Sequence, residues 1–344
     1  MEKSGLKHKT PAGRIITSRR QFIGALGAGA AALWLGAGSR AARAQSASAA
    51  SDQGVARISP LQAFNFLTLA QLDGLIDARV KAVGGSVDWK PAFPAYVPTA
   101  EALRGGSIDI GSGSSTSFLT AADGEKDLVV FAVEHSSGKD QGIVATAASG
   151  IKTVADLVGK KVAVNQGGTG EYLLRLALAR HEIPVEKVQV VYLGPTDAAT
   201  AFSQGQVDAW AVWEQFFAMG QAEPGAQVVV YASDIGSLNR NVHVTTRRFA
   251  QEHPLLVRAV YDAMRQEAQA VQSKPDLVAE LNEKAGVPKD VADIIRRIPP
   301  STIIPADESV LKEFQEIADF YTRYGLTKQP IDVTGTVYNV ITPG

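Results

Sequence analysis

The chain is 344 residues long, and its 45% apolar and 20% charged residues are typical of a globular protein able to bury two domain cores. A net charge of −1 argues against binding nucleic acid or an anionic membrane surface through a broad basic face. The chain has no cysteine, which excludes disulfides, thiolate metal sites, cysteine nucleophiles and a lipoprotein anchor.

The first element in chain order is an export signal. The stretch Ser18-Arg19-Arg20-Gln21-Phe22 places two adjacent arginines ahead of a weakly hydrophobic run, and an A-x-A-like cleavage site follows at Ala42–Ala44. The alternative is a transmembrane anchor, but the apolar run from Phe22 to Gly38 is short for a bilayer span. The sequence therefore predicts a twin-arginine signal peptide over residues 1–44, cleaved near Ala44, and a periplasmic mature protein.

The mature chain begins with a flexible small-residue leader over 45–54. After it, short apolar runs alternate with helical patterns, which is typical of βαβ units and a largely parallel sheet. Strands are predicted near residues 55–61, 87–93, 108–111, 128–134, 162–165, 188–193, 207–212, 228–231 and 242–246. Helices are predicted over 67–83, up to Arg104, and over 171–181, 198–204 and most of 249–324.

Two α/β blocks with a return to the first block predict a two-lobed protein with a ligand cleft between the lobes. Lobe 1 is expected to comprise residues 55–141 and 242–344, and lobe 2 residues 142–241. The apolar segments 142–147 and 239–246 are the expected crossovers between them.

Three loops follow predicted strands and open predicted helices, at 62–65, 112–117 and 167–170. Helix N-termini present free backbone N–H groups and a partial positive charge, which suits an anionic head group. Gly167 and Gly168 permit close approach of the backbone, and Ser and Thr hydroxyls in these loops can donate hydrogen bonds. Ser and Thr before a helix are also common N-caps, so each loop taken alone favours capping, whereas the three loops taken with the motif order described below favour a ligand site.

A family resemblance is carried by stretches in a fixed order: Ser107–Gly111, Thr153–Val164, Gly167–Leu174, Tyr192–Ala198, Gly205–Glu214, the Asn239 region and Arg247–Phe249. With them, about residues 57–260 resemble the solute-binding proteins of ABC importers, closest to the aliphatic sulfonate group related to the nitrate- and taurine-binding proteins. The resemblance implies an α/β, type II-like periplasmic binding protein fold. Each lobe would be a mixed sheet flanked by helices, with two hinge crossovers.

The implied function is capture of a small organic anion, an alkane- or arylsulfonate, and its delivery to an ABC permease in the inner membrane. We expect a monomer with no cofactor, no metal site, no nucleic-acid partner and no catalytic residue. One alternative is a desulfinase-like or pyrimidine-synthase-like enzyme on the same fold, although the resemblance implies that such relatives work through cysteine. Another is a ligand-binding partner of a membrane sensor.

The expected ligand contacts lie in the three loops and at strand ends or crossovers: Gln62, Asn65, Tyr96, Ser114, Ser115, Thr116, Gln141, Gly168, Thr169, Trp213, Glu214 and Asn239. Trp213-Glu214 resembles the family's Trp–acidic pair, although tryptophan is more often a core residue. Glu214 can contact a ligand amine or hydroxyl, or bond across the lobes. Because a carboxylate beside an anion is unfavourable, Arg240 is a candidate counter-group, with a plain exposed arginine as the alternative.

One departure from the family pattern concerns the ligand. Family members usually carry Gly-Pro after the second strand, whereas Phe93–Thr99 places Tyr96 there. This aromatic ring favours a larger or aromatic ligand, stacked on Tyr96 or Trp213, over a simple alkanesulfonate.

Overall fold

The computed structural model describes residues 51–121 and 127–342. The predicted signal peptide over 1–44 and leader residues 45–50 lie outside the described residues. Within the described ranges, no helix combines the length and apolar character needed to cross a bilayer.

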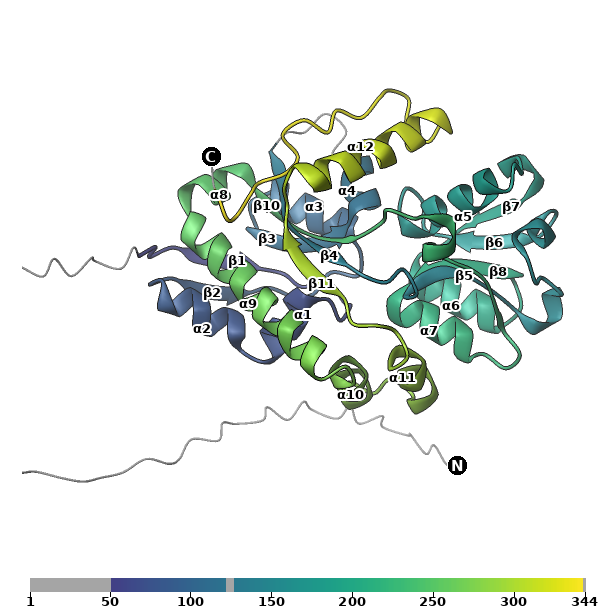
Figure 1. The fold of residues 1–344 in the computed structure, drawn as a ribbon, viewed down its shortest axis with the longest axis horizontal. Coiled ribbons are helices and arrows are strands. Elements are labelled where there is room, and N and C mark those ends of the chain that lie inside the picture. Colours follow the sequence, from purple (N-terminus) through teal and green to yellow (C-terminus); the bar gives the residue numbers. More distant parts are fainter. Residues whose placement is uncertain (1–50, 122–126, 343–344) are drawn as a thin grey trace, which may run out of the picture. The chain divides into compact units, whose positions relative to one another are not determined.

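The first lobe is built on a six-stranded sheet in the order β11-β4-β10-β3-β1-β2 (Figure 1). Its strands are β1 (Val55–Ile58), β2 (Ser86–Trp89), β3 (Ile110–Ser114), β4 (Leu128–His135), β10 (Asn241–Thr246) and β11 (Thr302–Pro305). Its helices are α1 (Phe66–Leu72), α2 (Leu75–Ala82), α3 (Tyr96–Arg104), α4 (Ser115–Ala121), α8 (Arg247–Glu252), α9 (Pro254–Ser273), α10 (Leu277–Lys284), α11 (Lys289–Ile295) and α12 (Glu308–Arg323).

The second lobe is built on a five-stranded sheet in the order β7-β6-β8-β5-β9. Its strands are β5 (Gln141–Ala145), β6 (Lys161–Val164), β7 (Gln189–Tyr192), β8 (Ala209–Trp213) and β9 (Gln227–Tyr231). Its helices are α5 (Thr169–Arg180), α6 (Pro195–Ser203) and α7 (Glu214–Ala222). Figure 1 shows α5 on one face of this sheet and α6 and α7 on the other.

Both sheets are mixed, as the family resemblance implies, and the largely parallel sheet expected from the βαβ pattern is wrong. In the first lobe β1 is parallel to β2 and β3, but β10 is antiparallel to β3 and β4. In the second, β6 is parallel to β7 and β8, but β5 is antiparallel to β8 and β9. In chain order, β5 and β10 are the first strands that follow each passage of the chain from one sheet to the other. Strand direction after such a passage is not encoded in hydrophobic periodicity.

The chain passes between the lobes at residues 136–140 and 232–240. These segments precede the expected crossovers, because the apolar residues of 142–147 and 239–246 mostly belong to the buried strands β5 and β10. A pattern rich in β-branched residues indicates a strand, and the connecting residues carry no such pattern.

Three other elements differ from the prediction. The helix expected over 67–83 is two helices, because Gly74 adopts a left-handed φ of 69° between them, and Leu72 consequently lies 57% exposed. The loop expected at 112–117 does not exist, since β3 runs to Ser114 and α4 begins at Ser115. Strand β11 interrupts the region expected to be helical and pairs antiparallel with β4.

Apolar side chains form three cores. One packs α1, α2 and α9 on one face of the first sheet, and another packs α6 and α7 around Trp210 of the second sheet. The third runs from α3, α4 and α12 of the first lobe into α5 of the second. There the ring of Tyr172 lies 5.3 Å from that of Phe320 and 5.9 Å from that of Tyr321, measured between centroids. The lobes are therefore joined by packed apolar side chains as well as by the two crossing segments.

Candidate functional site

A cavity of about 210 Å³ lies between the two lobes, and we call it the interlobe cleft. Nearly all of its wall comes from places where a strand ends and a helix begins. The lining residues are Leu61, Gln62, Ala63, Pro94, Ala95, Tyr96, Val97, Gly113, Ser114, Ser117, Thr120, Gln141, Asn165, Gln166, Gly167, Thr169, Gly194, Pro195, Trp213, Glu214, Gln215, Phe216, Asn239 and Asn241. Helices α3, α5, α6 and α7 all begin at this cavity, which places the positive ends of four helix dipoles around it.

Asn239 connects the two lobes at the base of the interlobe cleft. Its Nδ2 donates to Oγ1 of Thr169 at 3.1 Å and to Oε1 of Gln141 at 2.9 Å. Its Oδ1 accepts from Oγ1 of Thr116 at 2.8 Å, and Ser115 Oγ lies 3.4 Å away. The buried amide of Asn239 thereby holds the start of α4 and the start of α5 in a fixed relation.

The first turns of α4 and α5 are capped by side chains of the protein. In α5, the Gly170 N–H donates to Oδ1 of Asn165 at 2.7 Å. In α4, the Ser117 N–H donates to Oγ of Ser114 at 3.2 Å. Capping of this kind leaves side-chain hydroxyls and amides as the main donors that a solute in the interlobe cleft can reach.

The electrostatic character of the interlobe cleft is unusual for an anion site. Among the lining residues within the described ranges there is no lysine, arginine or histidine, and Glu214 is the only carboxylate. Arg240, the candidate counter-group, instead pairs with Glu313 of α12 at 3.5 Å and donates to the carbonyl oxygen of Ser237. An anion bound here would be held by neutral donors and helix dipoles, not by a formal positive charge.

Glu214 is the most constrained residue of the cleft. Its backbone takes a left-handed φ of 49°, which is uncommon for a residue with a side chain, and its N–H donates to the carbonyl oxygen of Asp140 at 2.6 Å. Its Oε1 accepts from Nδ2 of Asn241 at 2.6 Å. Burial, against the lowering effect of the hydrogen bond from Asn241 and with smaller contributions from the carboxylates of Asp140 and Glu134, raises the pKa of Glu214 to about 7.

The structure brings most of the expected contact residues to the cleft. Eight of them line it: Gln62, Tyr96, Ser114, Gln141, Thr169, Trp213, Glu214 and Asn239. The other four do not: Ser115 and Thr116 lie behind the wall and bond to Asn239, Gly168 lies against the side chain of Asn165, and Asn65 caps α1 by accepting the Thr68 N–H.

The two expected aromatic walls differ in how much surface they offer. Tyr96 is only 4% exposed, because its ring packs on the backbone of Gly113 and lies 6.2 Å from the ring of Phe118. A methyl group at Gly113 would lie 2.2 Å from the Tyr96 ring, so this glycine is required by the packing. Trp213 is half-buried and stands edge-on to Phe216, 6.5 Å between ring centroids.

Several lining residues were not among the expected contact residues, namely Ser117, Thr120, Asn165, Gln166, Gln215, Phe216 and Asn241, although Ser117 belongs to the expected 112–117 loop. Asn165 and Gln166 directly follow β6, and Phe216 follows the Trp213-Glu214 pair. Their position after a strand was the available signal, since ligand sites in open α/β sheets gather at the carboxyl ends of strands. Thr120 had no such signal, because it reaches the cleft from one turn inside α4, where its Oγ1 donates to the carbonyl oxygen of Gly167 at 2.8 Å.

Comparison with known proteins identifies close relatives of this chain. The NMT1/THI5-like family model matches residues 87–278. A protein of Escherichia coli K12 named as an aliphatic sulfonates-binding protein is 31% identical over 275 residues, covering 79% of this chain and 85% of the relative.

Two solved structures share the fold. The alkanesulfonate-binding protein SsuA from Xanthomonas axonopodis pv. citri, bound to MOPS, superposes with a TM-score of 0.77 at 27% identity, over 84% of this chain and all of its own. The periplasmic aliphatic sulphonate-binding protein SsuA from Escherichia coli superposes with a TM-score of 0.73 at 29% identity, over 84% of this chain and 92% of its own.

Proposed function

This chain belongs to the NMT1/THI5-like family, and we propose that it is the periplasmic solute-binding component of an ABC importer. The solute is a small organic anion, an alkane- or arylsulfonate, held in the interlobe cleft. The proposal extends to this chain what the names of its relatives say of those proteins.

The observation that carries the proposal is the neutral, donor-rich wall of the cleft. A sulfonate has three oxygens that only accept hydrogen bonds and carries no proton to donate. The hydroxyl of Thr169 and the amide of Gln141 can supply several such bonds together, whereas both N–H donors of Asn239 are already used within the protein. Charge spread over three oxygens is satisfied by distributed donors and helix N-termini without a buried countercharge.

The organic part of the solute has an apolar surface to lie against. Trp213 and Phe216 form an edge-on aromatic pair on the second-lobe side of the cleft. Val97, which is 57% exposed, lines the first-lobe side. Tyr96 contributes little ring surface, so we assign the stacking role to Trp213.

The proposed setting is the periplasm. We propose that residues 1–44 direct twin-arginine export and are cleaved near Ala44, which the mass of the mature protein would test. We propose a monomer in which lobe 1 comprises residues 55–141 and 242–344 and lobe 2 residues 142–241. The two lobes would close on the solute, and the closed form would bind an inner-membrane permease. We propose that the protein binds its solute without catalysing a reaction. The family resemblance implies that desulfinase-like enzymes on this fold use a cysteine thiol, and this chain has no cysteine.

Calorimetry with the purified mature protein tests the ligand class. Propane-1-sulfonate, benzenesulfonate and the carboxylate analogue of each form a matched panel. We expect dissociation constants near the micromolar range for at least one sulfonate, about −8 kcal/mol, and weaker binding of its carboxylate. Absence of heat and of any thermal shift with every sulfonate would contradict the proposal.

A matched pair of variants locates the site. Thr169→Val removes one cleft hydroxyl at nearly constant volume and should weaken sulfonate binding about tenfold, as expected for one lost hydrogen bond to a charged group. Thr200→Val makes the same change on the exposed face of α6 and should leave the affinity unchanged. Equal affinities for both variants would place the anion elsewhere.

A further inference from the structure

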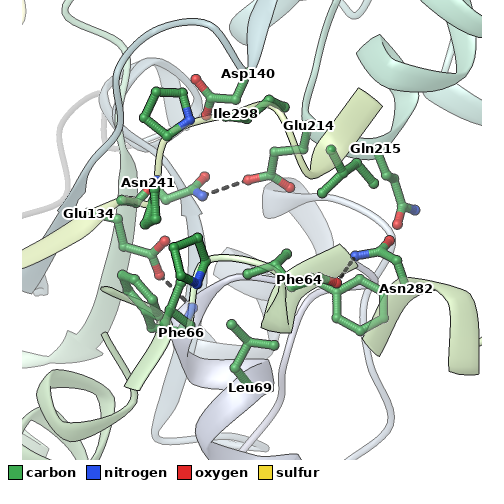
Figure 2. Close-up of a pocket in the computed structure, with 17 residues that line it drawn as sticks. Phe64, Phe66, Leu69, Glu134, Asp140, Glu214, Gln215, Asn241, Asn282 and Ile298 are labelled. Carbon is green, nitrogen blue, oxygen red and sulfur yellow. Dashed lines mark hydrogen bonds between the residues drawn. The ribbon is translucent and has the colours of Figure 1, made fainter. Parts of the chain in front are cut away.

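A second cavity, of about 110 Å³, adjoins the interlobe cleft. It lies between α1, α9, α10 and the segment after α11 on the first lobe and the start of α7 on the second (Figure 2). Glu214, Gln215 and Asn241 line both cavities, so the hydrogen bond from Asn241 to Glu214 forms part of the wall between them. Its volume is several times the roughly 15 Å³ needed for one water molecule.

The polar part of this second cavity consists largely of hydrogen-bond acceptors. The carboxylates of Glu134, Asp140 and Glu214 gather around one end, whereas Phe64, Phe66 and Leu69 form an apolar floor (Figure 2). Among its lining residues within the described ranges there is no lysine, arginine or histidine. Three carboxylates thus face one small cavity without a cationic side chain in its wall.

An independent sign of a missing donor comes from Asn282 of α10. This side chain is 1% exposed and lines the second cavity. Its Nδ2 donates to the carbonyl oxygen of Val278 at 2.9 Å, but its Oδ1 has no hydrogen-bond partner among the described residues. A buried acceptor without a donor is energetically unfavourable, so the site is incomplete as it stands.

The hydrogen-bond donors already present do not use the full accepting capacity of the carboxylates. Glu134 Oε1 accepts the Phe66 N–H at 2.7 Å and lies 2.8 Å from Nε2 of His243. Asp140 accepts from Oγ of Ser136 at 2.8 Å. Each carboxylate can accept about four hydrogen bonds, so accepting capacity remains. Burial raises the pKa of Asp140, against smaller lowering effects of its hydrogen bonds and of the Arg240 charge, and burial also raises the pKa of Glu214, so the surroundings do not fully compensate either acid.

We propose that the second cavity binds an organic ammonium group, whose N–H donors serve the carboxylates and Asn282 and whose carbon stem lies on the aromatic floor. The ammonium can belong to the far end of the captured sulfonate, since the two cavities share a wall, or to a separate small amine. The inference goes beyond the proposed function and rests on it only in the first case.

Calorimetry with a matched solute pair tests the first source. Propane-1-sulfonate and 3-aminopropane-1-sulfonate differ only at the terminal atom, and longer homologues of both extend the series. For the homologue long enough to reach across the shared wall, the amine-bearing sulfonate should bind at least about tenfold more tightly than the plain sulfonate, in keeping with a charge-assisted hydrogen bond. Asn282→Leu and, separately, Asp140→Asn should abolish most of this gain, and Asn282→Leu should leave the plain sulfonate's affinity unchanged.

The second source is tested with propylammonium alone and with propylammonium added to protein saturated with propane-1-sulfonate. Binding that is lost in Asn282→Leu supports a separate amine. Glu280→Gln is the matched control, because it removes one carboxylate from the outer side of the same helix, where Glu280 pairs with Lys274. Thermal unfolding of each variant establishes that it is folded.

The outcomes separate this inference from the proposed function. If plain sulfonates bind but neither an amine-bearing sulfonate nor propylammonium gains from the second cavity, the inference is overturned and the proposed function stands. If no sulfonate binds but propylammonium does, and Asn282→Leu abolishes that binding, the proposed function fails and the inference stands. Equal amine binding by the wild type and both variants also overturns the inference.

Discussion

At the scale of single residues, Glu214 is an acidic side chain placed between the proposed anion site and the proposed ammonium site. The bond from its N–H to Asp140 and the bond to its side chain from Asn241 fix it between the two cavities in a left-handed backbone conformation. A carboxylate there opposes an anion on one side and attracts a cation on the other. Its protonation state should therefore decide which solutes the protein holds.

The affinity for a plain alkanesulfonate should fall as the pH rises through about 7, the pKa to which burial raises Glu214. The sign follows from linkage: the anion prefers the protonated acid, so it loses up to about tenfold in affinity per pH unit once Glu214 is ionised. Glu214→Gln should bind with little pH dependence between pH 6 and 9, measured by calorimetry.

Other groups near Glu214 could impose the same dependence. Asp140 and Glu134 face it, and His243 bonds to Glu134. If Glu214→Gln keeps the wild-type slope, one of these groups is responsible and the assignment to Glu214 is wrong. An amine-bearing sulfonate should show the opposite trend, since an ionised Glu214 attracts its ammonium.

At the scale of elements, the start of α5 shows what the cleft requires of the backbone. Gly170 lies so close to β8 that a Cβ there would sit 2.4 Å from the carbonyl oxygen of Ala211 and 2.8 Å from Oδ1 of Asn165. Only a residue without a side chain lets α5 begin at this point with Asn165 as its cap. The glycines of this loop therefore serve close packing of helix on strand, in addition to any approach to a solute.

Gly170→Ala should destabilise the protein by roughly 1–3 kcal/mol, because the methyl group meets backbone that cannot move aside, and should weaken sulfonate binding by displacing Thr169. Chemical denaturation and calorimetry measure the two effects. Gly194→Ala is the matched control in the same cleft wall, since nothing lies within 4 Å of its added Cβ, and it should leave the stability unchanged. Equal stabilities of the two variants would contradict the packing argument.

The elements also show where sequence patterns succeed. Apolar β-branched runs correctly indicated most strands, because a half- or fully buried strand needs such residues whichever neighbour it pairs with. The same patterns failed at Gly74 and at Ser112–Ser114. There a left-handed glycine ended a helix inside an apolar repeat, and small polar residues continued a strand inside a tightly packed sheet.

At the scale of the whole molecule, one amide links the lobes at the cleft. Asn239 lies in the second crossing segment and bonds to Thr116 of the first lobe and Thr169 of the second. Helices α4 and α5 come from distant parts of the chain, so their relation depends on this contact, on the hydrogen bond from Thr120 to Gly167 and on the aromatic packing between α5 and α12.

Asn239→Ala should lower the free energy of unfolding by about 1–3 kcal/mol, since it removes hydrogen bonds to three buried partners. It should also weaken sulfonate binding at least about tenfold, because donors from the two lobes lose their common anchor. Thermal unfolding and calorimetry measure these effects, and Asn339→Ala, which removes an amide that caps a turn near the C-terminus, serves as the control. An unchanged affinity in Asn239→Ala would show that the cleft is organised by packing alone.

The sequence by itself determined the α/β class, the family and eight of the residues that line the cleft, because strand ends and helix starts can be located from local periodicity and motif order. Only the tertiary structure decided that Ser115 and Thr116 stand behind the wall, that Arg240 turns to Glu313, and that three carboxylates and Asn282 line one cavity. These facts depend on the rotation of each side chain and on the folding of segments as far apart in the chain as those of Glu134 and Asn282 around one cavity. Local sequence patterns do not predict such long-range geometry, because it depends on residues far apart in the chain.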